Sequence, residues 1–148
     1  MFRGQFTHAI DAKGRTSLPS RFRESLGSEW DQRLVLTPAL FDPCIHVFPF
    51  GAWEAFEARV AAMPQFDPNV VRLRRLYVSA AVECDLDKQG RVLVPACMRE
   101  HAALARDVLW AGVGNKAELW AAERWADATK MASEDWDNLK QAMAGWGL

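Results

Sequence analysis

The sequence predicts an α+β protein built from two copies of one unit. Residues 10–23 and 86–99 share the pattern apolar-Asp-x-x-Gly-Arg-x-x-apolar-Pro-x-x-apolar-Arg, at a constant spacing of 76 residues (87 minus 11, and 99 minus 23). Around each copy, short β-prone stretches alternate with short helical ones. Half of the 148 residues are apolar and a quarter are charged, which is typical of a globular chain with one core or two small intertwined ones. The duplication predicts a pseudo-symmetric body.

In the first copy, the pattern predicts a hairpin, a short helix, a second pair of strands and a longer helix. Gly14 is expected to supply a positive φ in the hairpin turn at residues 11–14, Pro19 to begin the short helix and Pro64 to end the longer one. A further helix is expected before the second copy. The expected strands are residues 5–10, 16–18, 33–37 and 44–48, and the expected helices are residues 20–26, 50–63 and 68–80.

The second copy repeats this order. Its later part aligns with the first copy at a spacing of 72 residues (119 minus 47, and 125 minus 53) instead of 76, which places a deletion in a strand connection, where deletions are best tolerated. The expected strands are residues 81–86, 91–94, 108–111 and 117–120, and the expected helices are residues 96–103, 122–131 and 133–143. We therefore expect a first repeat over residues 1–64, a connecting helix over residues 65–80, a second repeat over residues 81–125 and a helical tail over residues 126–148.

Charge is distributed unevenly, although the net charge is only −1. Residues 1–23 hold five basic side chains against one acidic, residues 69–99 hold six against three, and residues 117–148 hold three against six. The two positive regions contain the two repeats, so a nucleic-acid site would have to be a local patch. The sequence shows no signal-peptide pattern and no apolar run of about 20 residues, which predicts a cytosolic protein that does not enter a membrane.

The repeated turn carries the most distinctive chemistry. Its glycine permits a tight backbone, the aspartate before it can accept hydrogen bonds from nearby amides, and the arginine after it is directed outward at the start of a strand. Arg15 and Arg91, flanked by Lys13 and Lys88, suit phosphate groups or guanine edges. Alternatively, each aspartate merely pairs with its arginine to hold the hairpin. Two copies in register, each with a proline and a further arginine, favour the binding role.

The cysteines and histidines offer a weaker pattern. Cys44, Cys84 and Cys97 lack the spacing of a disulfide framework or a zinc ribbon. Cys97 and His101 lie four residues apart on an expected helix, and Cys44 and His46 share a strand face, but two ligands do not make a metal site. We find no catalytic triad, phosphate-binding glycine loop or dinucleotide fingerprint. The sequence thus predicts no catalytic residues, no metal site and no cofactor.

Longer motifs resemble one known family. Residues 1–4 (Met-Phe-Arg-Gly), the two Asp-x-x-Gly-Arg turns and residues 112–120 (Gly-Val-Gly-Asn-Lys-Ala-Glu-Leu-Trp) are similar to MraZ, a family of bacterial transcriptional regulators. The resemblance covers essentially the whole chain, and Ala117 departs from it because family members tend to have an aromatic residue there. It implies two AbrB-like (SpoVT-AbrB) domains in one chain, which form a pseudo-two-fold, swapped-hairpin β-barrel with peripheral helices. It also implies ring-shaped homo-oligomers.

The resemblance further implies a function. Members bind repeated boxes in double-stranded promoter DNA upstream of the division and cell wall gene cluster and usually repress their own operon, which implies a cytoplasmic, nucleoid-associated protein. The DNA-contacting motif of the family falls on Asp11 and Arg15 in the first copy and on Asp87 and Arg91 in the second. Charge adds further phosphate contacts. These are Lys13 and Lys88 inside the turns and, as weaker candidates, Arg3, Arg21, Arg23 and Arg99.

Two other functions compete with DNA binding. In a non-DNA assembly module, the repeat arginines would face a neighbouring subunit. In an enzyme, Arg15 and Arg91 would hold an anionic small molecule. Trp136 and Trp146 lie near an acidic tail and mark a candidate subunit interface, whereas Trp53 occupies a helical packing position.

Overall fold

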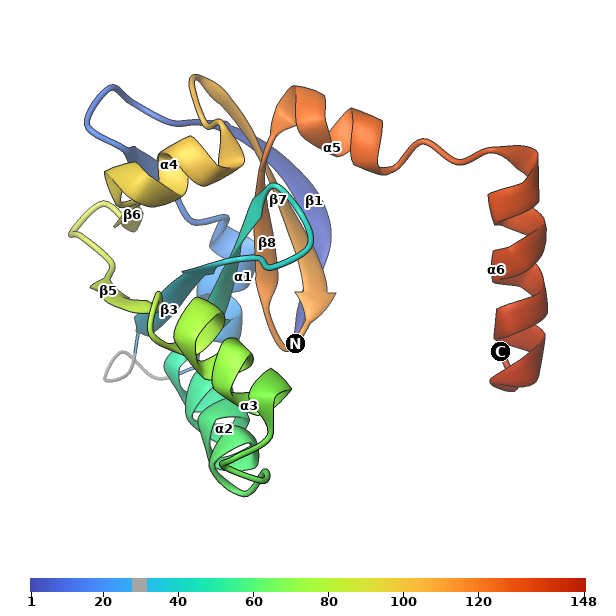
Figure 1. Cartoon of the computed structure of the whole chain (residues 1–148). Coiled ribbons are helices and arrows are strands. Elements are labelled where there is room, and N and C mark those ends of the chain that lie inside the picture. The colour runs from blue at the N-terminus through green and yellow to red at the C-terminus, as the bar shows by residue number, and fades with distance from the viewer. Residues whose placement is uncertain (28–31) are drawn as a thin grey trace.

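The computed structural model describes residues 1–27 and 32–148 and shows an α+β fold (Figure 1). The first half contains β1 (Phe2–Ala9), β2 (Arg15–Ser17), α1 (Ser20–Ser25), β3 (Arg33–Pro38), β4 (Cys44–Pro49), α2 (Phe50–Ala61), α3 (Pro68–Leu73) and the π-helical turn η1 (Arg74–Val78). The second half contains β5 (Val82–Asp85), β6 (Arg91–Leu93), α4 (Ala96–Ala102), β7 (Asp107–Gly114), β8 (Ala117–Ala121), α5 (Ala122–Ala128) and α6 (Ser133–Gly145). Every element expected from the sequence is present, but several bounds differ. β1 begins at Phe2 instead of residue 5, β7 extends to Gly114 instead of residue 111, and α5 ends at Ala128 instead of residue 131.

The largest local difference is in the helix expected over residues 68–80. It is α-helical only to Leu73 and continues as the π-helical turn η1, in which Tyr77 makes tertiary contacts. The carbonyl oxygen of Tyr77 accepts a hydrogen bond from Thr37 Oγ1 at 2.8 Å, and the Tyr77 ring lies edge-on to Trp53. Residues 74–78 are too distant in sequence from these partners for a local pattern to reveal the wider turn.

The strands are antiparallel, and the two copies of the repeat occupy equivalent positions in the strand order. One sheet has the order β1-β7-β8-β4-β3-β5, and β2 pairs with β6 in a second sheet. The repeat relates β1 to β5, β3 to β7 and β4 to β8, so the order is the same from either end. The first strand of each copy pairs with the third strand of the other, since β1 pairs with β7 and β5 with β3. The two copies therefore share one sheet.

The register of two ladders shows where the pseudo-two-fold axis of the repeat lies. In the β2–β6 ladder Thr16 pairs with Val92, its own repeat equivalent at a spacing of 76 (92 minus 16). In the β4–β8 ladder His46 pairs with Glu118, its equivalent at a spacing of 72 (118 minus 46). A residue that pairs with its own equivalent lies at the axis. The two repeat spacings found in the sequence, 76 and 72, are thus both consistent with a single pseudo-two-fold axis.

The closed barrel that the resemblance implies is not found among the described residues. β1 and β5 are the two ends of the larger sheet, and the β2–β6 pair is a separate sheet that is joined to the first by the isolated Ile10–Thr16 bridge next to β1. β2 and β6 have three residues each, so their ladder is short. The exchange of strands is present without barrel closure.

The main core lies against the inner face of the larger sheet. Alternate strand residues such as Leu36, Val47 and Leu119 point inward and pack with Phe22 of α1 and Met98 of α4. The outer face carries two smaller clusters. One is formed by Val35, Phe48, Trp53 and Tyr77, and the other by Ala39, Cys44 and Trp120 with Trp125 packed against it.

The two outer clusters are repeat equivalents as well. Trp53 on α2 contacts Phe48 with ring centroids 5.2 Å apart, and Trp125 on α5 contacts Trp120 at 5.8 Å. Each tryptophan and its partner are related by the spacing of 72 (125 minus 53, and 120 minus 48). The packing position expected for Trp53 is confirmed.

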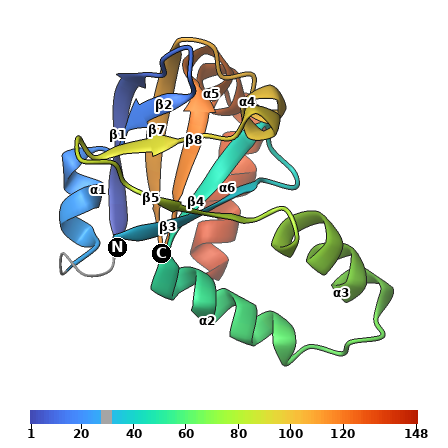
Figure 2. The same cartoon turned by 90° about the vertical axis from the view of Figure 1, so that its left-hand side faces the viewer.

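The helices extend from the sheet in different directions. α2 and α3 lie together at the end away from the β1–β2 connection, as both views show (Figure 2). α6 stands apart from the body after α5, and none of its side chains is buried (Figure 1). None of the helices in the described part of the chain is long and apolar enough to cross a lipid bilayer.

Candidate nucleic-acid interface

The first turn is held by the carboxylate of Asp11. Its Oδ1 accepts hydrogen bonds from the backbone N–H groups of Lys13 at 3.0 Å and Arg15 at 2.9 Å, and its Oδ2 accepts one from Arg15 Nε at 2.8 Å. Gly14 adopts a φ of +88°, as expected. The hydrogen bond from the Arg15 backbone is the largest of the causes that hold the pKa of Asp11 below its usual value. Asp11 is therefore a carboxylate at neutral pH.

The second turn repeats this geometry. Asp87 Oδ1 accepts from the backbone N–H groups of Gln89 and Arg91, both at 2.9 Å, and Asp87 Oδ2 accepts from Arg91 Nε at 2.8 Å. Gly90 has a φ of +74°. The backbone N–H of Arg91 is the first cause of a lowered pKa at Asp87. The two turns thus share one backbone design.

Each aspartate does pair with its arginine, and the ion pair does not use the terminal nitrogens of the guanidinium. In each turn the ion pair uses Nε of the guanidinium. The two terminal nitrogens are outside that pair, and the Arg15 and Arg91 side chains are 34% and 29% exposed. A guanidinium fixed through Nε presents a planar fork in a defined orientation, which is the geometry of bidentate recognition. The aspartate therefore positions the arginine.

The β2–β6 ladder brings the two arginines to one surface. Arg15 pairs with Leu93 and Arg91 pairs with Ser17, so all four residues face the same side. Diagonal neighbours of this kind have side chains about 7–8 Å apart. The alternate residues Thr16 and Val92 are buried against the core. A short two-stranded ribbon therefore presents Arg15 and Arg91 outward, on either side of the pseudo-two-fold axis.

Two of the weaker candidates reach the turns by crossing between copies. A Cβ placed on Gly90 would lie 2.5 Å from Nη1 of Arg23, and one placed on Gly14 would lie 2.8 Å from Nε of Arg99. Arg99 Nε also donates to the backbone oxygen of Val94 at 3.2 Å. Arg23 of the first copy therefore covers the second turn, and Arg99 of the second copy covers the first.

The other two weaker candidates lie elsewhere. Arg3 and Arg21 line a pocket of about 550 Å³ near the N-terminus, together with Glu24. Arg3 is at the opposite end of β1 from the turn, and a strand of this length spans about 25 Å. Figure 1 shows the N-terminus and the β1–β2 connection at opposite ends of the strand. The structure does not bring these two arginines to the ribbon.

The structure adds one residue that the sequence interpretation missed. Arg91 Nη2 donates to Gln89 Oε1 at 2.8 Å, a contact within the second turn. The repeat equivalent of Gln89 is Lys13 (89 minus 76), whose ammonium group cannot accept a hydrogen bond. Lys88 instead takes the place of Ala12. The signal was present in the alignment of the two copies, as a difference at an otherwise matching motif.

Comparison with known proteins agrees with this architecture. The chain matches the family described as "MraZ protein, putative antitoxin-like" over residues 1–76 and again over residues 77–145. It is 38% identical to the transcriptional regulator MraZ of Desulfitobacterium hafniense (strain Y51) over 148 residues, which is the full length of both chains. It is 41% identical over 145 residues to the protein of that name from Limosilactobacillus fermentum, with 98% of each chain covered. The corresponding protein of Heliobacterium modesticaldum is 40% identical over the full length of both chains.

The fold and the two matching turns define a duplicated α+β protein with strands exchanged between its copies. The double match and the full-length relatives are more specific. The chain belongs to the MraZ family of transcriptional regulators. The segment boundaries expected at residues 64, 80 and 125 stay predictions.

Proposed function

We propose that the chain is a sequence-specific DNA-binding regulator that reads repeated promoter boxes with the β2–β6 ribbon. The observation that carries this proposal is the outward placement of Arg15 and Arg91 on one face of the ribbon, each held by an aspartate. The major groove of B-DNA admits a two-stranded ribbon, and arginine is the commonest partner of guanine O6 and N7 there. Paired arginines about a two-fold axis also match the symmetry of a DNA duplex.

Each part of the interface has a separate role in this proposal. Arg15 and Arg91 contact base edges, and Asp11 and Asp87 hold their orientation. The lysines of the turns contact phosphate groups and set the position on the duplex. Arg23 and Arg99 raise the local positive charge beside the turns, on a protein whose net charge is −1. Catalysis has no part in this role.

A single ribbon offers few phosphate contacts, so strong binding requires several chains. Repeated subunits facing repeated DNA boxes add avidity when the two spacings match. We therefore propose a ring-shaped homo-oligomer that binds repeats upstream of the division and cell wall gene cluster and represses it.

α6 is the proposed subunit contact. One stripe of this helix is apolar and exposed, with Trp136 at 59%, Trp146 at 68% and Leu139 and Met143 between them. Exposed apolar faces of this kind mark protein contacts. The body offers an apolar groove of about 440 Å³ whose lining includes Phe41, which is 94% exposed. The groove also contains Arg72, which complements the acidic first turn of α6.

Seating α6 of one copy in this groove of the next is a heterologous contact. Such contacts generate rings when the rotation between neighbouring copies closes. The double variant Trp136→Ser, Trp146→Ser is expected to reduce the particle mass measured by light scattering. Gln141→Ser, on the opposite side of the helix, is the matched control and should leave the mass unchanged. Equal masses for the double variant and the native chain would contradict this contact.

DNA binding is tested with the double variant Arg15→Ala, Arg91→Ala and DNA taken from upstream of the chain's own gene. Fluorescence anisotropy should show loss of specific binding, while circular dichroism and light scattering stay unchanged. Arg3→Ala, Arg21→Ala removes the same charge away from the ribbon and should keep most of the affinity. Undiminished binding by the first variant overturns the proposal. A change of particle mass in that variant would instead favour an assembly role for the arginines.

A further inference from the structure

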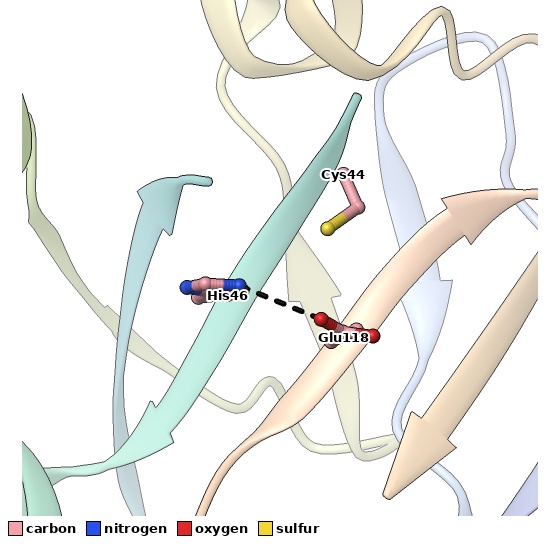
Figure 3. A group of neighbouring side chains, drawn as sticks. All are labelled: Cys44, His46 and Glu118. Atoms are coloured by element: carbon pink, nitrogen blue, oxygen red, sulfur yellow. Dashed lines mark ion pairs between the residues drawn. The ribbon is translucent and has the colours of Figure 1, made fainter. Parts of the chain in front are cut away.

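Three side chains capable of binding a metal meet on the outer face of the larger sheet. Cys44, His46 and Glu118 each offer one donor atom, and these atoms all lie within 4.8 Å of one another (Figure 3). Cys44 and His46 alternate on β4, and Glu118 lies directly opposite His46 on β8. The sheet register thus supplies a third ligand to the pair noticed in the sequence.

The spacing of the donors suits a small tetrahedral ion. His46 Nε2 lies 3.6 Å from Glu118 Oε2. With zinc–ligand lengths of about 2.0–2.3 Å, tetrahedral ligand atoms are about 3.3–3.8 Å apart. Figure 3 shows the sulfur of Cys44 directed toward the His46–Glu118 pair. The three donor atoms, which all lie within 4.8 Å of one another, would approach to about 3.3–3.8 Å around a bound ion.

Neighbouring residues form hydrogen bonds with the atoms of His46 and Glu118 that are not candidate metal ligands. His46 Nδ1 is hydrogen-bonded to the hydroxyl of Tyr77 at 2.6 Å, and Trp120 Nε1 donates to Glu118 Oε1 at 3.2 Å. These contacts leave His46 Nε2 and Glu118 Oε2 facing each other. Metal-binding histidines and carboxylates are usually oriented by such outer partners.

The set lies at the edge of the protein interior. Cys44 is fully buried, whereas the side chains of His46 and Glu118 are 16% and 18% exposed. An ion can therefore enter from solvent, and water can fill a fourth position. Three protein ligands with one open position differ from the closed four-ligand arrangement of structural zinc sites.

We propose that Cys44, His46 and Glu118 bind one Zn²⁺ ion per chain, with water as the fourth ligand. A mixed sulfur, nitrogen and oxygen set favours zinc over the hard cations calcium and magnesium. Coordination replaces the thiol proton, which leaves to solvent as the sulfur–zinc bond forms. Because His46 and Glu118 lie at the pseudo-two-fold axis, the ion joins the two copies of the repeat.

The exposed pair Cys97 and His101 provides the matched control. Both lie on α4, and His101 Nε2 already contacts the backbone oxygen of Asp42 at 3.2 Å. No third donor joins them in the described part of the chain. A metal signal that depends on Cys97 would therefore show that the metal binds outside the proposed site.

The experiment titrates Co²⁺ and then Zn²⁺ into the chelator-treated full chain. Cobalt should give a thiolate charge-transfer band and the strong visible absorption of a tetrahedral ion, both removed by one equivalent of Zn²⁺. Cys97→Ser should keep the band, and Cys44→Ser should abolish it. Glu118→Gln, which keeps the side-chain volume, should weaken binding by on the order of 100-fold, and Tyr77→Phe by about 10-fold.

Three results would overturn the proposal: no binding by the native chain, a band retained in Cys44→Ser, or a band lost in Cys97→Ser. Thermal unfolding gives an independent measurement. Zn²⁺ should raise the Tm of the native chain and of Cys97→Ser, because only the folded state assembles the ligands. If Cys44→Ser does not fold, unaltered zinc affinity of the Glu118→Gln variant contradicts the site by itself.

Discussion

The two turns of the repeat share a backbone and differ in how firmly their arginines are held. In both, one aspartate accepts two backbone hydrogen bonds and one from arginine Nε, at closely matching distances. Among the residues that the structure describes, a further side chain, Gln89, holds the guanidinium only in the second turn. In the first, Lys13 supplies a positive charge at that position. The two copies thus share the scaffold and differ at the position of Lys13 and Gln89, where the first turn has a positive charge and the second a further contact to its guanidinium.

The largest expected effect is on stability. It should differ between the turns because different atoms surround Gly14 and Gly90. Both have a positive φ, which costs other residues about 1–2 kcal/mol. A Cβ at Gly14 would also lie 2.8 Å from the backbone oxygen of Val94, which cannot move aside, whereas at Gly90 the close atoms belong to the flexible Arg23 side chain. Gly14→Ala should therefore lower the free energy of unfolding by about 2–4 kcal/mol and Gly90→Ala by about 1–2 kcal/mol.

Urea unfolding of both variants measures this difference. Gly51→Ala on α2, where an added Cβ meets nothing within 4 Å, is the control and should be neutral or slightly stabilising. Equal losses at Gly14 and Gly90 would show that the backbone contact at Val94 relaxes freely.

Exchanging the side chains at positions 13 and 89 should exchange the extra positive charge and the guanidinium contact between the two turns. In the proposed DNA complex, Lys13→Gln removes one phosphate contact, so the slope of log affinity against log salt should become shallower by about 1. Gln89→Lys should make it steeper by about 1 while releasing Arg91. Salt titrations of DNA binding measure both changes. Slopes that stay equal to the native value would place both residues away from the phosphates.

The smallest expected effect concerns pH. The pKa values of Asp11 and Asp87 are held below 3.8 in the folded chain, so their stabilising contribution is fully present above that value. It is lost as the pH falls through the lowered values, because the unfolded chain then binds protons more readily. The unfolding free energy should decline below about pH 4. Asp11→Asn together with Asp87→Asn should flatten this decline, and an unchanged decline would assign it to other carboxylates.

Interactions between close neighbours in sequence were predicted well. The turn, its glycine and the aspartate–arginine contact span residues 11–15 or 87–91, so the local motif contains all the partners. The helix that begins after Pro19 and ends near Gly27 is equally local. The structural role expected for the aspartate–arginine contact is present, and because the pairing uses only Nε it is compatible with a binding role for the same arginine. The binding role stays a prediction.

Interactions across the repeat could not be predicted in this way. The placement of Arg23 over Gly90 and of Arg99 over Gly14 depends on the exchange of strands between copies. Likewise, the sequence placed Cys44 and His46 on one strand face, but only the β4–β8 register adds Glu118. The barrel closure that the resemblance implies is not found in residues 1–27 and 32–148.

By itself, the sequence determined the duplication, the order of the elements and the design of each arginine turn. These depend on backbone preferences and hydrogen bonds within about five residues, which any window of the chain contains. Only the tertiary structure decided which strands pair, where the pseudo-two-fold axis lies and which side chains meet across it. The contacts of the β2–β6 and β4–β8 ladders at the axis join residues 70 or more apart, and their positions follow from sheet register, which is set by packing of the whole core.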